Sequence, residues 1–447
     1  MRRRSLILLV PATCLLLIAM AFYLGQNRLE LLPALDLPYL HSATSSTSVG
    51  ADAKQTVATP TSWAATSATT SQNNGMISNG SILPASKITA YLTAILDPTA
   101  TEPPRLECPS LNISRYEPLL QQHQGPSHFD YYFALDLRNC LPLLPRLLGS
   151  IIETIRFLGP ERCVLSVIEG NSPDGTADVL VSLRPLLDDI NLAYYFNSSD
   201  INPAKGNRIH KLAELRNQAL NPILSNLDQV SENTTIIFLN DVAACSEDIL
   251  ELALQRNTLG ADMTCAMDWT YAGMDPTFYD VWVARTLGGD SFFDIPSDGN
   301  WNSAWNLFWN APDTRVRYEA KLPFQVFSCW NGAAAIGAAP LLGGLRFRET
   351  HGGQDGECVQ GEPQIFCKEM WFRGYRKIAV VPTVNLEYSD ANAQKIKRLK
   401  GFTSDLVRKQ RESDARINWV LEPPPKVKCM PTWDNQFWRP WNESLLS

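Results

Sequence analysis

The sequence is short of positive charge. Its 447 residues include 39 Lys and Arg against 46 Asp and Glu, which gives a net charge of −7 at pH 7. It has no long basic run, whereas proteins that bind nucleic acids usually carry a basic patch or stripe. We therefore expect no nucleic-acid partner. An anionic ligand would need a metal ion or a few well-placed Arg and Lys side chains.

The sequence also lacks any Cys-x-x-Cys pair and has only five histidines, which argues against a zinc site. Nine of its ten cysteines lie beyond the N-terminal apolar run and are widely spaced. In an oxidising compartment such cysteines form disulfides. We expect several disulfides with one or more thiols left free. The alternative is that most of them are buried thiols.

Charge is missing altogether from residues 6–25. As a helix, a segment of this length spans about 30 Å, the thickness of a bilayer core. We expect a transmembrane signal anchor here and a cytoplasmic tail at residues 1–5, because the arginines at positions 2–4 favour the cytoplasmic side. The alternative is a signal peptide cleaved near residues 19–21. Both place the remaining chain in the secretory pathway.

Large apolar residues are scarce from residue 42 to residue 73, where 15 of 32 residues are Ser or Thr. Such a segment cannot bury enough apolar surface to offset its loss of conformational entropy. We expect a disordered Ser/Thr-rich stalk at residues 26–107 and a folded lumenal domain at residues 108–447. Five N-glycosylation sequons fit a lumenal location: Asn79, Asn112, Asn197, Asn233 and Asn442.

From residue 128 onward, segments typical of strands alternate with segments typical of helices. The pattern predicts strands at residues 131–135, 164–168, 192–196 and 235–239. It predicts helices at residues 141–158, 176–187 and 211–220, the last disturbed or ended by Asn221-Pro222. This order predicts an α/β fold with a mainly parallel central sheet. Ligands of such sheets bind beyond the C-terminal ends of the strands.

An acidic residue ends the second predicted strand. Glu169 could accept hydrogen bonds from a nucleotide base or ribose, and Asp174 lies in the turn that follows. We expect both residues near the nucleotide of a donor. The alternative is a plain connection between strand and helix, in which Asp174 serves the turn and the helix start.

The fourth predicted strand ends in Asn240-Asp241, which puts oxygen ligands at the edge of the sheet. Such ligands suit Mn²⁺ or Mg²⁺, which keep positions open for diphosphate oxygens. We expect a metal site there that neutralises a leaving diphosphate. The alternative is a turn before a helix. His351 is the histidine best placed for a metal or phosphate role.

Basic side chains gather on the third predicted helix. Arg208 and Arg216 could reach a phosphate group, and Asn217 lies beside them. We expect all three to bind the donor. The alternative is a solvated helix face.

The last motif lies in residues 327–362. Trp330 offers a flat apolar face to a sugar ring and Asn331 follows it, so we expect both to contact the acceptor, although core packing is the commoner use of a tryptophan. Glu357 or Glu362 could orient the acceptor hydroxyl or stabilise positive charge at the sugar carbon.

Together these motifs resemble a known family. Residues from about 128 to about 441 are similar to the fungal cryptococcal mannosyltransferase (capsule-associated protein) family, glycosyltransferase family 69. The resemblance rests on the order of short motifs at residues 169–176, 212–217, 239–241, 265–269, 280–285, 329–332, 347–348 and 374–375.

The resemblance implies a GT-A-like nucleotide-sugar transferase fold in a type II membrane protein of the Golgi. It implies a retaining α-1,3-mannosyltransferase with GDP-mannose as donor, a glycan as acceptor and Mn²⁺ as cofactor. Glu169 would contact the nucleotide, and Asp241 would bind the metal. We further expect Asp268 and Asp280 to contact the donor sugar or the ligands of the metal, and Asp268 joins the two glutamates as a catalytic candidate.

The sequence departs from the family pattern at the metal motif. The usual Asp-x-Asp of GT-A enzymes is represented by Asn240-Asp241-Val242, with a single carboxylate. A second metal ligand would then come from elsewhere, such as His351 or Asp268. The alternatives are a non-catalytic factor of the same fold that supports assembly or export of a surface polysaccharide, and a hexosyltransferase that uses another nucleotide sugar.

Overall fold

The computed structural model describes residues 77–121, 128–351 and 356–445. The predicted tail (1–5), the predicted anchor (6–25) and residues 26–76 of the predicted stalk lie outside the described residues. None of the helices in the described ranges is long and apolar enough to cross a membrane.

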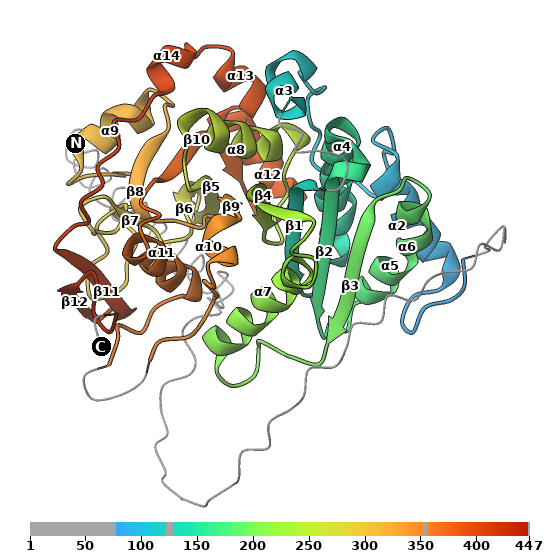
Figure 1. Ribbon diagram of the computed structural model, residues 1–447, viewed down its shortest axis with the longest axis horizontal. Helices are drawn as coiled ribbons and strands as arrows, with labels where there is room; N and C mark the ends of the chain where they lie inside the picture. Colours follow the sequence, from blue (N-terminus) through green and yellow to red (C-terminus); the bar gives the residue numbers. More distant parts are fainter. Residues whose placement is uncertain (1–76, 122–127, 352–355, 446–447) are drawn as a thin grey trace, which may run out of the picture. The chain divides into compact units, whose positions relative to one another are not determined.

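A sheet of ten strands runs through the middle of the described chain (Figure 1). Neighbouring strands follow the order β3-β2-β1-β4-β9-β5-β10-β8-β7, and β6 pairs with β5. The first half of the sheet contains β1 (Phe129–Leu137), β2 (Cys163–Gly170), β3 (Ala193–Ser199) and β4 (Val230–Leu239). The other strands are β5 (Met263–Ala272), β6 (Asp275–Phe278), β7 (Arg285–Thr286), β8 (Phe324–Ser328), β9 (Ala333–Gly337) and β10 (Ile378–Leu386).

The prediction of a mostly parallel sheet is confirmed. β3, β2, β1 and β4 are parallel to one another, and β10 is parallel to β5. β9 lies between the two groups and is antiparallel to both β4 and β5, so β5 and β10 point in the same direction as β1 and β4. Short antiparallel pairs with β6, β7 and β8 complete the sheet. The C-terminal ends of all the long parallel strands therefore meet at one edge.

Helices cover both faces of the sheet, and each face has its own core. Alternate residues of β1 show this, because Tyr131, Phe133 and Leu135 belong to one core whereas Tyr132 and Ala134 belong to the other. The first core draws on α2 (Ala85–Leu96), α3 (Ile113–Leu120), α4 (Leu144–Leu158), α5 (Thr176–Ser182), α6 (Arg184–Asp188), α8 (Ser246–Leu259) and α12 (Asp390–Lys400). The second draws on α7 (Arg208–Ser225), α10 (Ala339–Leu342) and α11 (Glu362–Phe372). The peripheral elements are α9 (Pro312–Glu319), α13 (Thr403–Val407), α14 (Glu412–Ala415) and the hairpin of β11 (Lys426–Thr432) and β12 (Asn435–Pro440).

The predicted helices are present with two differences. The helix predicted at residues 176–187 is divided into α5 and α6, because Pro185 has no N–H with which to continue the backbone hydrogen bonds. The helix predicted to be disturbed or ended at Asn221-Pro222 continues through Pro222 to the end of α7. A proline so close to a helix end removes few backbone bonds, and its own side chain is buried.

The folded unit begins earlier than the predicted boundary at Cys108. α2 lies within the predicted stalk, and its Ile88 and Leu92 are buried in the first core. Just before α2, the carboxylate of Asp178 accepts hydrogen bonds from the backbone N–H groups of residues 81–83. The stalk prediction is therefore wrong for residues 77–107, because it extended the Ser/Thr-rich composition of residues 42–73 across a short amphipathic helix.

Three disulfides join distant parts of the described chain, and three buried cysteines remain free, which confirms the expectation of several disulfides with some thiols left over. The disulfides are Cys108–Cys245, Cys265–Cys329 and Cys358–Cys429. The free cysteines are Cys140, Cys163 and Cys367.

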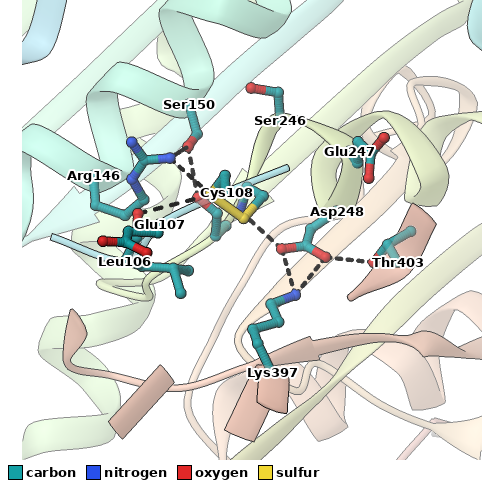
Figure 2. The surroundings of a disulfide bond; sticks show 12 residues. Leu106, Glu107, Cys108, Arg146, Ser150, Ser246, Glu247, Asp248, Lys397 and Thr403 are labelled. Atoms are coloured by element: carbon teal, nitrogen blue, oxygen red, sulfur yellow. Dashed lines mark hydrogen bonds and ion pairs between the residues drawn. A yellow bond between two sulfur atoms is a disulfide. The ribbon is translucent and has the colours of Figure 1, made fainter. Parts of the chain in front are cut away.

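The Cys108–Cys245 disulfide attaches residue 108 to the start of α8 and lies beside a buried ion pair (Figure 2). Asp248 in the first turn of α8 accepts hydrogen bonds from the ammonium of Lys397 at 2.6 and 2.7 Å. It also accepts from Thr403 and from the backbone N–H of Cys245. Asp248 therefore joins α8 to α12 and α13 and caps α8.

We expect Lys397→Met to lower the free energy of unfolding by about 3–5 kcal/mol, because Asp248 would remain a buried carboxylate without its cation. Urea unfolding of the full chain measures the change. Lys395→Met on the same helix is the control, because Lys395 is exposed and its ammonium contacts no carboxylate of the described residues, only Asn392 and the ring of Tyr271. Equal loss in both variants would contradict the role of the buried pair.

Candidate active site

The register of the parallel strands brings their polar ends together. Leu135 of β1 lies opposite Leu239 of β4, so Asp136 lies beside the Asn240-Asp241 pair that follows β4. On the other side of β1, Leu137 lies opposite Glu169 of β2. Acidic residues from three adjacent strands therefore share one edge of the sheet, as the sequence predicted for Glu169 and Asp241.

Arg216 of α7 is the centre of the contacts at this edge. Its Nε donates to Glu362 Oε1 at 2.8 Å, and its Nη1 donates to Asn240 Oδ1 at 3.3 Å. The guanidinium lies over the ring of Trp330, 4.7 Å from its centroid, and next to two phenylalanine rings. Arg216 thus joins α7, the end of β4 and the first residue of α11 in one buried cluster.

This cluster corrects the predicted roles of Trp330 and Asn240. Trp330 is buried beneath Arg216 and donates its Nε1–H to Asn240 Oδ1 at 2.9 Å, so it has no open face for a sugar ring. Because Asn240 Oδ1 already accepts from Trp330 and from Arg216, it is committed as an acceptor and is a poor metal ligand. Glu362 is present at the site, but as the ion-pair partner of Arg216.

Asp241 and Asp136 are the acids that remain available. Burial raises the pKa of Asp241 to about 6, although its own backbone N–H, Arg216 and Arg208 act in the opposite sense. Burial raises the pKa of Asp136 to about 7; Arg216 opposes this, and the charges of Glu362 and Asp241 add to it. For these two neighbouring carboxyl groups, the positive charges within the described chain do not outweigh the effect of burial on the pKa.

The two carboxylates fit a divalent cation. Among the described residues, no other residue donates a hydrogen bond to Asp136 or Asp241, so their oxygens are free to bind an ion. No set of three His, Cys, Asp or Glu residues in the described ranges could hold a metal by itself. Mg²⁺ and similar hard ions are commonly held by one or two carboxylates, with substrate phosphates and water as the other ligands. The pair has the chemistry of such a site.

Asp136 was missed by the sequence analysis, although a signal was present. The predicted strand stopped at residue 135, and the acidic residue directly after it received no role. The same rule that selected Asp241, a carboxylate at the end of a buried strand, also selects Asp136.

His351 and Glu357 belong to a different cluster. His351 is exposed, and its backbone N–H donates to Glu357 Oε2 at 3.0 Å, so its predicted metal role is not supported. Glu357 is buried and is also bound by Arg348, at 2.6 and 3.0 Å, and by Lys368. Burial alone would raise its pKa, but the Arg348 and Lys368 contacts lower it to about 2. Glu357 is thus a fixed counter-ion, which corrects its prediction as a catalytic residue.

Asp268 and Asp280 form a second pair of acids. Asp268 is fully buried within β5, opposite the last residue of β10. Its Oδ2 accepts from the hydroxyl of Tyr388 at 2.6 Å, and its Oδ1 has no hydrogen-bond partner among the described residues. Asp280 accepts from the backbone N–H of Asn331 at 2.8 Å. Burial raises the pKa of both residues, that of Asp280 to about 6, and the charge of Asp280 raises the pKa of Asp268 further.

This pair faces the Arg216 cluster through Asp280, whose pKa responds to the charges of Arg216 and Glu362. Asp280 is half-buried, whereas Asp268 is fully buried. Asn331 is fully buried, and its side-chain amide donates to the carbonyl of Ala266. Asn331 therefore positions Asp280, which corrects its prediction as an acceptor contact.

Two predicted donor contacts have structural roles instead. Asp174 accepts from the N–H and hydroxyl of Thr176 and from the N–H of Leu141, which agrees with the alternative of a turn before a helix. Asn217 exchanges hydrogen bonds with the backbone of Phe347 at 2.8 and 3.0 Å, and so holds that ring against Arg216.

Glu169 and Arg208 remain candidates for donor binding. Glu169 is buried and accepts from Ser198 Oγ at 2.6 Å and from the backbone N–H of Ser172, so it fixes the loop after β2 against β3. Arg208 begins α7, and its charge acts on both Asp136 and Asp241. Their predicted contacts with a nucleotide stay predictions.

The five predicted glycosylation sites differ in exposure. Asn79, Asn112 and Asn233 are exposed, whereas Asn197 in β3 and Asn442 are half-buried. The exposed side chains are open to modification, and glycosylation at all five stays a prediction.

Comparison with known proteins identifies similar sequences. The model of a family described as "Cryptococcal mannosyltransferase 1" matches residues 130–369. An α-1,3-mannosyltransferase, CMT1, of Cryptococcus neoformans var. neoformans serotype D is 35% identical over 383 residues, which cover 77% of this chain and 79% of that protein. The residues that match the family model include Asp136, Glu169, Asp241, Asp280 and Glu362.

Solved structures resemble the chain less closely. The mannosyltransferase PcManGT from Pyrobaculum calidifontis, in complex with GDP-Man and Mn²⁺, is 14% identical with a TM-score of 0.35, covering 68% of this chain and 67% of that chain. Residues 1–349 of TarS from S. aureus, in complex with UDP-GlcNAc, are 13% identical with a TM-score of 0.34, covering 64% and 69%.

We expect Arg216→Met to lower the free energy of unfolding by about 3–5 kcal/mol, because it leaves Glu362 buried without a cation. Urea titration of the full chain measures this loss. The double variant Arg216→Met/Glu362→Gln should recover much of it, since no charge remains buried. If the losses of the two single variants simply add in the double variant, Arg216 and Glu362 are not coupled.

The variant Asp268→Asn should be more stable than the wild type, by a difference in unfolding free energy that grows as pH rises. A carboxyl group whose pKa is raised in the folded state holds a proton that the unfolded chain releases, so the wild type loses stability above the unfolded pKa, and Asn does not. We expect the difference in unfolding free energy to grow in favour of the variant as pH rises above about 4, the ordinary pKa of an unfolded Asp. Asp275→Asn on β6, an exposed site, is the control and should show no such trend.

Proposed function

The chain belongs to the cryptococcal mannosyltransferase family and is a glycosyltransferase, and from this premise we propose that it is a retaining α-1,3-mannosyltransferase that moves mannose from GDP-mannose to a glycan acceptor. The name of the relative that is 35% identical, an α-1,3-mannosyltransferase, supports mannose as the transferred sugar and the α-1,3 linkage. The proposal includes a GT-A-like fold and a divalent cation, Mn²⁺ or Mg²⁺.

The observation that carries the proposal is the pair of carboxylates, Asp136 and Asp241, beside two arginines at the C-terminal edge of the sheet. A nucleotide diphosphate brings negative charge to this edge, and two carboxylates alone would repel it. A divalent cation held by the pair would neutralise the charge that develops on the leaving diphosphate. Arg208 supplies further positive charge, whereas the charge of Arg216 is balanced by Glu362.

Each remaining residue has a proposed part in binding or transfer. Glu169 and the loop that it fixes seat the nucleotide. Asp280, held by Asn331 and backed by Asp268, accepts hydrogen bonds from hydroxyls of the mannose. In a front-face displacement the acceptor oxygen bonds to the anomeric carbon as the bond to the diphosphate breaks. The acceptor proton then passes to the leaving diphosphate.

We further propose that residues 6–25 anchor the protein in a Golgi or other secretory-pathway membrane, with the catalytic domain in the lumen. The support is the charge-free stretch behind three arginines in the sequence. Three disulfides in the described chain fit an oxidising compartment.

The alternative of a non-catalytic factor rests on the single carboxylate in Asn240-Asp241-Val242. Asp136 weakens it, because the adjacent strand supplies a second carboxylate to the same edge. A transferase that uses another nucleotide sugar would differ from the proposed mannosyltransferase only in the shape of its donor pocket. The donor is therefore identified by a direct assay.

We expect the full chain to release GDP from GDP-mannose with Mn²⁺ and to lose this activity in EDTA. Asp241→Asn should reduce turnover at least about a thousandfold, which corresponds to about 4 kcal/mol of activation free energy. Its melting temperature should not fall, because it removes a buried charge that no other described residue neutralises by a direct contact.

Asp228→Asn, at an exposed site before β4, is the matched control and should retain full turnover. UDP-glucose, UDP-galactose and GDP-fucose are offered in parallel. Turnover of another donor alone would replace GDP-mannose, and no binding of any donor would favour the non-catalytic factor. A folded Asp241→Asn protein with full turnover would remove Asp241 from the site.

A further inference from the structure

A hollow of roughly 440 Å³ lies outside the candidate active site, beside the Cys108–Cys245 disulfide. Its wall is formed mostly by the chain between residues 98 and 110, which follows α2, with Arg146 and Glu153 of α4 on the other side. We call it the Arg146 hollow. Its volume is within the usual range for small-molecule sites, about 300–1,000 Å³.

Arg146 is a buried cation that lacks an anionic partner. Its side chain is only 6% exposed. Nη1 donates to Cys108 Sγ at 2.8 Å and to Ser150 Oγ at 3.3 Å, contacts that Figure 2 shows, and Nε has no partner among the described residues. No carboxylate of the described residues forms an ion pair with it. Charged side chains are almost never buried without such a partner.

The acids around Arg146 are already in use. Asp390 accepts from the backbone N–H of Leu106, Asp248 binds Lys397, and Glu153 accepts from the hydroxyl of Ser246. Burial and the nearby charge of Arg105 lower the pKa of Arg146 to about 10, so it is still charged at neutral pH. Its charge is thus offset only from a distance.

The second arginine of the hollow differs in this respect. Arg105 donates through Nη1 and Nη2 to five backbone carbonyls, among them those of Ala94 and Pro145, and so holds the segment after α2 in place. Its role is structural and complete. Arg146 keeps donor capacity at the hollow that no described residue uses.

We propose that the Arg146 hollow binds a small hydroxylated oxyanion, with the guanidinium of Arg146 on its carboxylate or phosphate group. A guanidinium offers parallel N–H donors that match these two groups. The wall also carries Glu107 as an acceptor for hydroxyl groups, and Thr101 and Ser110 as partners of either kind. Its charged residues are two arginines and two glutamates, which favour a single anionic group with several hydroxyls over a polyanion.

Calorimetric titration of the full chain without added metal tests this site, with glucuronate, mannose 6-phosphate and neutral mannose as probes. We expect at least one of the two acids to bind and mannose to bind at least tenfold more weakly. The acid that binds identifies the group as a carboxylate or a phosphate. Arg146→Gln should weaken binding at least tenfold, whereas Arg156→Gln, at an exposed site of the same helix, should leave it unchanged.

Ser110→Trp provides a test that spares the buried contacts. Ser110 is exposed on the wall, so a large side chain there should fill the hollow without disturbing Arg146. We expect it to weaken binding as Arg146→Gln does, with an unchanged melting temperature. Binding of neither acid, equal binding of mannose, or full binding by Ser110→Trp would overturn the proposal. Sugar transfer is not measured, so the result is independent of the proposed activity.

Discussion

The buried charge of Arg216 is the constraint on which the candidate active site depends. A guanidinium at the end of a parallel sheet must be neutralised and hydrogen-bonded, and here Glu362 and Asn240 supply both. These contacts of Arg216 hold α7 against α11 and against the end of β4. The guanidinium also packs against aromatic rings, and the side chains of Trp330 and Phe347 are used for this contact.

With Arg216 paired to Glu362, the cluster contributes little net charge to the acids beside it. Four carboxyl groups, those of Asp136, Asp241, Asp268 and Asp280, then lie at the same edge with raised pKa values. Burial is the first cause in every case, and mutual repulsion adds to it for Asp136 and Asp268. Four carboxyl groups buried at one edge of the sheet are unfavourable when no ligand is bound to them. Raised pKa values of this size are typical of sites where a ligand or a proton is meant to bind.

The sequence predicted the strands and the edge well, because periodicity and strand ends are local properties. Glu169, Arg216 and Asp241 were selected from their positions after strands or on a helix, and the structure places all three at this edge. The errors share a physical cause: a sequence pattern does not reveal which oxygen or ring a tertiary contact will occupy. Trp330 could have faced a sugar, but it lies under Arg216. Glu357 could have been catalytic, but Arg348 and Lys368 hold it.

In the proposed enzyme, the geometry of the sheet explains how a metal ion can be bound without an Asp-x-Asp motif. Two carboxylates within one strand end are one way to surround an ion, but the strands of a parallel sheet are only about 5 Å apart, so neighbouring ends serve equally well. Leu135 and Leu239 are in register, which brings Asp136 of β1 to the level of Asn240. Asn240 is meanwhile used to hold Arg216 and Trp330. Asn240, at the first position of the motif, thus holds neighbouring side chains in place. The adjacent strand β1 supplies the second acid, Asp136.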